Sequence, residues 1–148
     1  MIRNVFLHVG LASAILAGAG CRHGGEPTSD ALAYSSWHIV AVDGQPTPLT
    51  GDLLRDDIYA VDFGTDAVVG YGGCNRFSAS YSRAGDRLQL GPVAGTRRAC
   101  PEPVMGTEYR LLQILAQPLR IETPDARTLV LTGTDGAVRL RRSTPQPD

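Results

Sequence analysis

Cys74 is the residue of this chain best placed to do chemistry, because it stands at a turn in the sequence Gly-Gly-Cys-Asn. A cysteine there can act as a nucleophile when a base lies beside it. The candidate bases are His23, in a polar N-terminal stretch, and His38, which alternates with apolar residues as a structural strand histidine does. We therefore expect no catalysis by Cys74.

Metal and acid–base sites lack the residues that they need. A zinc site would have only Cys74, Cys100 and His38 as ligands, without the paired spacing that zinc sites show. Asp56 and Asp57 are adjacent, and neighbouring side chains of an extended chain point to opposite sides, so the two carboxylates do not converge. We expect no catalytic residue, no metal and no cofactor.

The glycine-rich run that ends at Gly73 has the composition of a phosphate loop but not its context. No lysine follows the run, and a strand comes after it where a phosphate loop would open a helix. Gly72 and Gly73 instead favour a tight bend between two strands, since glycine adopts positive φ without strain. Asn75 tolerates the left-handed conformation or caps the turn with its side chain.

The charged residues exclude one class of partner. The chain has 14 basic residues, all of them arginine, against 15 acidic residues, and its formal net charge is −1. The arginines are scattered along the sequence, without a basic stripe or interleaved aromatic residues. We therefore expect no binding to nucleic acid.

The N-terminus has the pattern of a signal peptide. Arg3 precedes an apolar run over residues 5–19, which is short for a membrane span and ends in small residues. The small residues lead into Cys21, a pattern that resembles a bacterial lipoprotein signal, although Gly18 stands where an aliphatic residue is usual. We expect residues 1–20 to be removed and Cys21 to carry lipid; the alternative is an ordinary cleaved signal.

An exported protein enters an oxidising compartment, where disulfides are permitted. With Cys21 lipidated, Cys74 and Cys100 remain, and one bridge between them is the simplest expectation. The alternative is two separate buried thiols.

The residue after Cys21 bears on the choice of membrane. An acidic residue at this position would favour the inner membrane, but Arg22 stands there, so we expect a periplasm-facing protein anchored in the outer membrane.

Short segments of alternating polarity predict five strands before residue 100 and two or three after residue 118. The strands are expected at residues 36–42, 58–64, 67–73, 75–82, 86–93, 119–123, 128–133 and 137–142. Apolar residues at helical spacing predict a helix over residues 103–117, which Pro118 ends. The side chains expected in the contact between helix and sheet are Met105, Tyr109, Leu112 and Leu115, with Trp37, Phe63 and Phe77 on the sheet side.

One helix cannot cover both faces of a sheet of seven or eight strands, so the sheet must curl on itself. We expect an α+β fold, a curved antiparallel half-barrel with the helix packed on its concave, open side. In its first strand, Trp37, Ile39 and Ala41 are expected to share one face. This domain takes up residues 35–142, between a flexible tether over residues 21–34 and a disordered tail over residues 143–148.

The motifs together resemble the META domain, the family of the HslJ-like heat-shock proteins and many bacterial envelope lipoproteins. The resemblance covers residues 35–142 and implies a curved antiparallel sheet with a packed helix. Arg97 and Arg98 depart from it, since family members often have an apolar residue just before Ala-Cys. The residues that carry the resemblance are Trp37, Phe63, Gly70, Gly73, Cys74, Asn75, Phe77, Tyr81, Thr96, Ala99 and Cys100.

The resemblance implies a location and a role rather than a reaction. Family members are linked to stress and antibiotic tolerance, and no motif residue has an accepted catalytic role. We expect a non-enzymatic envelope lipoprotein that supports envelope integrity, with the membrane as a partner through its anchor and an envelope protein as a possible second partner. The alternative is a carrier or pilot-like protein that binds an acyl chain or a hydrophobic peptide between sheet and helix.

Overall fold

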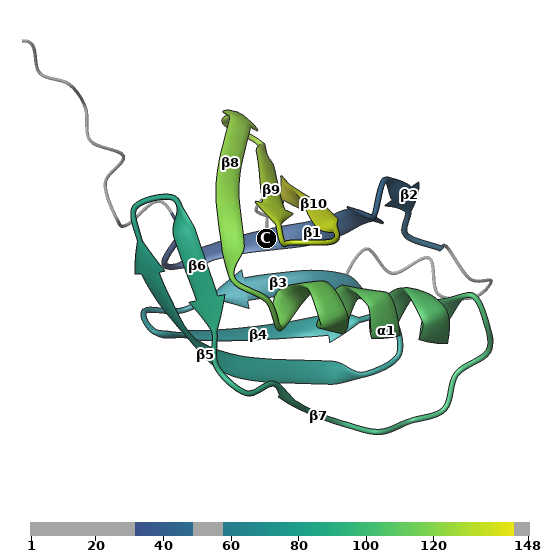
Figure 1. Cartoon of the computed structure of the whole chain (residues 1–148). Coiled ribbons are helices and arrows are strands. Elements are labelled where there is room, and N and C mark those ends of the chain that lie inside the picture. The colour runs from purple at the N-terminus through teal and green to yellow at the C-terminus, as the bar shows by residue number, and fades with distance from the viewer. Residues whose placement is uncertain (1–31, 49–57, 144–148) are drawn as a thin grey trace, which may run out of the picture.

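A computed structural model describes residues 32–48 and 58–143 (Figure 1). The predicted signal peptide, Cys21 and most of the tether lie outside the described residues, as do Asp56, Asp57 and nearly all of the predicted tail. The elements are β1 (Ser35–Val42), β2 (Gln45–Pro46), β3 (Tyr59–Phe63), β4 (Ala67–Gly72), β5 (Arg76–Ala84), β6 (Arg87–Leu90), β7 (Ala94–Gly95), α1 (Val104–Leu115), β8 (Leu119–Asp125), β9 (Thr128–Thr132) and β10 (Ala137–Arg142).

The longer strands form a closed antiparallel barrel. Its order is β1–β3–β4–β5–β6–β8–β9–β10, and β10 pairs with β1 to complete the ring. The predicted half-barrel was therefore wrong about closure, while the antiparallel sheet with one helix is confirmed. Main-chain hydrogen bonds between the first and last strands remove the open edge that the helix was expected to cover.

β1 changes its inward face part-way along its length. Trp37 and Ile39 are buried, the pairing with β10 then shifts register between Ile39 and Ala41, and Val42 is buried after the shift. A β-bulge adds one residue to a strand, so the alternation of inward and outward side chains moves by one position. The expectation that Ala41 shares a face with Trp37 and Ile39 was wrong for this reason.

α1 covers one end of the barrel, where it lies against β1, β4 and β10 (Figure 1). Its buried side chains are Val104, Glu108, Leu111, Ile114 and Leu115. The predicted face was displaced by one residue over most of its length: Tyr109 is 67% exposed, and Met105 and Leu112 are only partly buried. Because a charged residue occupies position 108, the true inward face looked polar in the sequence.

The barrel interior is filled by large apolar side chains. Trp37, Phe63 and Phe77 point inward and are at most 4% exposed, and the Arg142 guanidinium lies 4.6 Å from the centre of the Trp37 ring. The core side chains below 2% exposure include Ile39, Val68, Leu88, Leu111, Ile114, Leu119, Leu129, Leu131, Val138 and Leu140.

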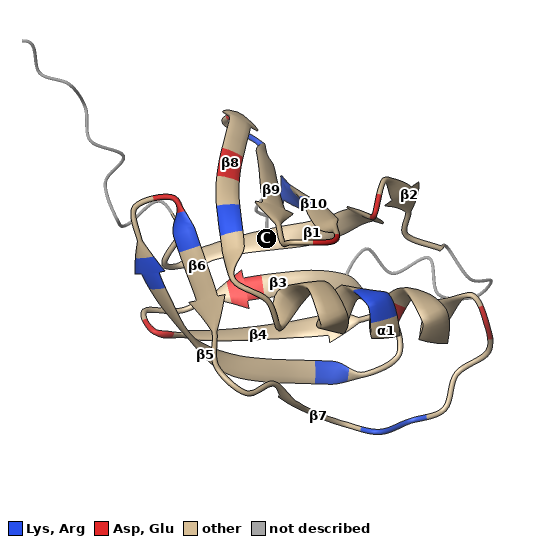
Figure 2. Ribbon diagram, viewed as in Figure 1, with Lys and Arg blue, Asp and Glu red and all other residues tan. Residues whose placement is uncertain are grey.

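Charged residues of both signs are interspersed along the strands (Figure 2). No helix within residues 32–48 and 58–143 is long and apolar enough to span a membrane.

Candidate functional site

The Gly-Gly-Cys-Asn turn joins β4 to β5 beside the first half of α1. The main-chain nitrogen of Gly72 donates to the carbonyl oxygen of Asn75 across the turn, at 2.9 Å. Gly73 has a φ of +104°, in the region that only glycine adopts without strain. A Cβ atom there would also lie 2.5 Å from Cζ of Tyr59, so both conformation and packing require this glycine.

Glu108 places a carboxylate inside this turn although its residue is only 5% exposed. Oε2 accepts hydrogen bonds from the main-chain nitrogens of Cys74, at 3.0 Å, and Asn75, at 2.6 Å. Oε1 accepts from Nδ2 of Asn75 at 2.7 Å. Burying a carboxylate is unfavourable unless donors surround it, and hydrogen bonds to a charged acceptor are stronger than neutral ones. Glu108 therefore fastens α1 to the turn.

The side chain of Asn75 binds a third segment, the loop between β7 and α1. Its Oδ1 accepts from the main-chain nitrogen of Arg98 at 2.6 Å and from Oγ1 of Thr96 at 2.8 Å. Its Nδ2 donates to the Arg98 carbonyl oxygen at 3.1 Å as well as to Glu108. The predicted roles of Asn75, a left-handed residue or a cap within the turn, are replaced by bonds to two other segments, and its φ is negative.

A disulfide joins the same turn to the same loop. Cys74 and Cys100 are bridged, with their Cα atoms 6.0 Å apart, so the predicted pairing is present. Cys100 lies between the bonded residue Arg98 and the first helical residue, Val104. The bridged sulfur of Cys74 is unavailable as a nucleophile.

Tyr59 closes the inner side of the turn, and sequence analysis gave no sign of it. Its hydroxyl is buried and has no hydrogen-bond partner within the described residues. Burial, and then the negative charge of Glu108, raise the pKa of Tyr59 to about 12, because both disfavour a phenolate. The phenol is thus held neutral beside the buried carboxylate.

The other residues that the sequence offered for chemistry do not join this site. His38 lies part-buried on β1, with its Cα paired to those of Arg141 and Ala60. Within residues 32–48 and 58–143, no three His, Cys, Asp or Glu side chains come together as a metal site would need. Sequence analysis also missed Glu108, whose only signal was its spacing of four from Val104 and three from Leu111 on the apolar face of the helix.

Comparison with known proteins assigns the family. The sequence model of the META domain matches residues 30–146. The chain belongs to the META domain family. The match spans the turn, both cysteines of the disulfide, the loop before α1 and Glu108.

Solved structures resemble this META domain in fold. An NMR structure of a protein from Burkholderia xenovorans has a TM-score of 0.61 at 20% identity, covering 97% of this chain and 99% of that chain. A second NMR structure has a TM-score of 0.62 at 21% identity, covering 76% and 92% respectively. No curated protein matches the chain. At these identities the likeness establishes the fold alone.

The META domain holds α1 through a second set of polar contacts, near the turns at one end of the barrel. Arg110 forms an ion pair with Asp43 of the β1–β2 turn and donates from Nη2 to the carbonyl oxygen of Asp135 at 2.6 Å. Asp43 also accepts from the main-chain nitrogen of Ala137 at 3.1 Å. The hydrogen bond from Arg110 is the main reason that the pKa of Asp43 lies below its usual value.

Proposed function

We propose that this chain is a non-enzymatic envelope lipoprotein, whose META domain faces the periplasm and supports envelope integrity under stress or antibiotics. The observation that carries the proposal is that the polar groups of the Gly-Gly-Cys-Asn turn and of Glu108 are bonded within the domain. Asn75 uses both ends of its amide, Glu108 accepts three hydrogen bonds, and Cys74 is in a disulfide. A catalytic group must instead reach a substrate.

The location is supported by two features of the chain. The disulfide is the kind of bond that persists outside the cytoplasm. The apolar run and small residues before Cys21 have the pattern of a lipoprotein signal. Lipid on Cys21 would make the membrane a partner of the domain through its N-terminus, with outer-membrane anchoring favoured by Arg22.

The carrier alternative would need an apolar cavity between α1 and the sheet. The inward side chains there are tightly enclosed: Leu111 and Ile114 are 0% exposed, and Leu115 is 4% exposed. Close packing of this kind favours an anchored interaction domain over a carrier of an acyl chain.

Complementation in the bacterium tests the proposal. A deletion strain should take up more of a hydrophobic fluorescent dye and survive antibiotic exposure less well than the parent. The wild-type gene should restore both readouts, whereas Cys21→Ser should restore neither, and metabolic labelling with an alkyne fatty acid should mark the wild type alone. Equal dye uptake in the deletion strain and the parent would contradict a role in envelope integrity.

A further inference from the structure

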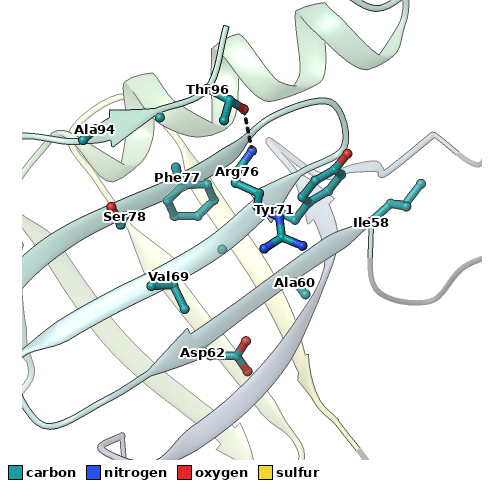
Figure 3. Close-up of a pocket in the computed structure, with 12 residues that line it drawn as sticks. Ile58, Ala60, Asp62, Val69, Tyr71, Arg76, Phe77, Ser78, Ala94 and Thr96 are labelled. Atoms are coloured by element: carbon teal, nitrogen blue, oxygen red, sulfur yellow. Dashed lines mark hydrogen bonds between the residues drawn. The ribbon is translucent and has the colours of Figure 1, made fainter. Parts of the chain in front are cut away.

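The outer face of the barrel carries a groove of about 870 Å³ that spans β3, β4, β5 and β7 (Figure 3). The pairing register explains its lining. Asp62 is opposite Val69, and Tyr71 is opposite both Ala60 and Arg76, so these side chains share the outward face. Ala94 and Gly95 of β7 line the far side. A groove of this volume lies in the range of small-molecule binding sites.

The floor of the groove is apolar and open to solvent. Val69 is 52% exposed at its centre, one of three large hydrophobic residues that the structure describes as exposed. Ala60 on β3 and Ala94 on β7 also line the groove, and their short side chains leave room for a ligand to approach the sheet closely. Covering the Val69 side chain with a ligand is favourable in free energy, because apolar surface is then removed from water.

Two opposite charges lie within the groove without a protein partner. Asp62 and Arg76 are both exposed, and within residues 32–48 and 58–143 neither side chain forms an ion pair or a hydrogen bond. Arg76 extends from β5 across β4 towards Ala60 (Figure 3). Two strands and two positions along the sheet separate the charged residues, which places their Cα atoms on the order of 12 Å apart.

We propose that this groove binds a short extended peptide with free ends. The terminal carboxylate would pair with the Arg76 guanidinium and the terminal ammonium with Asp62, while an apolar side chain covers Val69. An extended tripeptide spans at most about 10–11 Å, comparable to the separation of the two Cα atoms. The Arg76 side chain, which reaches towards Ala60 in this structure, would turn away from β3 to meet the terminal carboxylate. A fatty acid has no cation for Asp62, and a single amino acid would fill little of the groove. The site is distinct from the Gly-Gly-Cys-Asn turn, so it stands apart from the proposed function.

Titration with one tripeptide and its capped form tests the charge requirement. The exported protein carrying Cys21→Ser, labelled with ¹⁵N, is titrated with Ala-Val-Ala and with the same peptide acetylated and amidated. The free peptide should shift the amide signals of Val69, Tyr71 and Ala94, and the capped peptide should bind about tenfold more weakly or worse, because both charge-assisted contacts are lost. Free alanine should also bind more weakly than the tripeptide.

Two variants locate the charges on the protein. Arg76→Gln and Asp62→Asn should each weaken the free tripeptide by about tenfold, while Arg139→Gln, an exposed change on β10, should leave its affinity unchanged. The proposal is overturned by equal affinity for free and capped peptides, by unaltered binding in both groove variants, by alanine binding as tightly as the tripeptide, or by no shift of the groove signals at millimolar peptide.

Discussion

Oε2 of Glu108 lies 2.6 Å from the main-chain nitrogen of Asn75, which joins the helix to a turn that is 33 residues away in the sequence. The same carboxylate holds Cys74 and the Asn75 amide, and Asn75 in turn holds the loop before the helix. Three segments therefore meet at one buried charge. Loss of Glu108 or Asn75 would therefore leave polar groups of the other segments without partners.

Replacing Glu108 by glutamine should lower the free energy of unfolding by about 2–4 kcal/mol. The amide keeps one acceptor oxygen but brings an NH₂ group against nitrogens that are themselves donors, so at least one buried group loses its partner. Urea denaturation measures the effect. Glu122→Gln, an exposed change on β8, is the matched control and should alter stability by less than about 0.5 kcal/mol.

The disulfide should stabilise the domain mainly by restricting the unfolded chain. The bridged residues are 26 positions apart, and a loop of this length corresponds to about 3.5 kcal/mol in the chain-entropy treatment. Urea denaturation of the protein with Cys74→Ala and Cys100→Ala, compared with the oxidised wild type, measures this difference. Alkylation of the denatured wild type without reductant should label neither Cys74 nor Cys100; label on both would contradict the bridge.

The strands of the barrel could be predicted from sequence because one face of each is buried. In β5, Phe77 and Ala79 alternate with exposed Arg76 and Ser78, and the predicted segment agrees with the observed strand to within two residues. Closure of the barrel could not be predicted in this way. Pairing of β10 with β1 depends on register between chain ends, and no local pattern records it.

The cysteine pair could be predicted by counting, since only two cysteines remain once Cys21 is assigned to lipid. The partner of Asn75 could not, because a glutamate on a helix normally indicates a solvated face. Only its four-residue spacing from Val104 would have suggested an inward position for Glu108. The bulge in β1 left no mark in the sequence, which is why the position of Ala41 was predicted wrongly.

The observed buried face of α1 leads to a different prediction from the face that was expected from the sequence. Leu111→Ala should lower stability by about 2–5 kcal/mol, because the side chain is 0% exposed and its removal leaves a cavity. Tyr109→Ala removes a side chain that is 67% exposed and should change stability by less than about 1 kcal/mol. Thermal unfolding of the two variants measures both effects, and a larger loss for Tyr109→Ala would contradict the observed face.

Acid should weaken the domain partly through Asp43. Its pKa is lower in the folded state, chiefly because of the hydrogen bond from Arg110, so its stabilising effect is complete above the unfolded value near 3.8. That effect is lost as the pH falls through the lower, folded pKa. Asp43→Asn should therefore be less stable than wild type at pH 7, with a difference that shrinks below pH 4. Urea denaturation between pH 2 and 7 measures this difference in the free energy of unfolding. Asp62→Asn, in the groove away from this ion pair, is the control variant for its dependence on pH.

Alkali should weaken the domain through Tyr59, and the sign follows from its neutral folded form. Its pKa is about 12 in the folded state against 10.0 for an ordinary tyrosine, so its contribution is complete below pH 10 and is lost as the pH rises from 10 to 12. A shift of two units corresponds to a loss of about 2–3 kcal/mol. Tyr59→Phe should remove this part of the alkaline loss.

At pH 7 the free energy of unfolding of Tyr59→Phe should equal that of the wild type or exceed it by about 1 kcal/mol, because the variant deletes a buried hydroxyl that has no partner within the described residues. Urea denaturation from pH 7 to 12 measures both effects, with Tyr109→Phe, which removes an exposed hydroxyl, as the control. If Tyr59→Phe loses stability in parallel with the wild type between pH 10 and 12, the phenol is not held neutral by its surroundings.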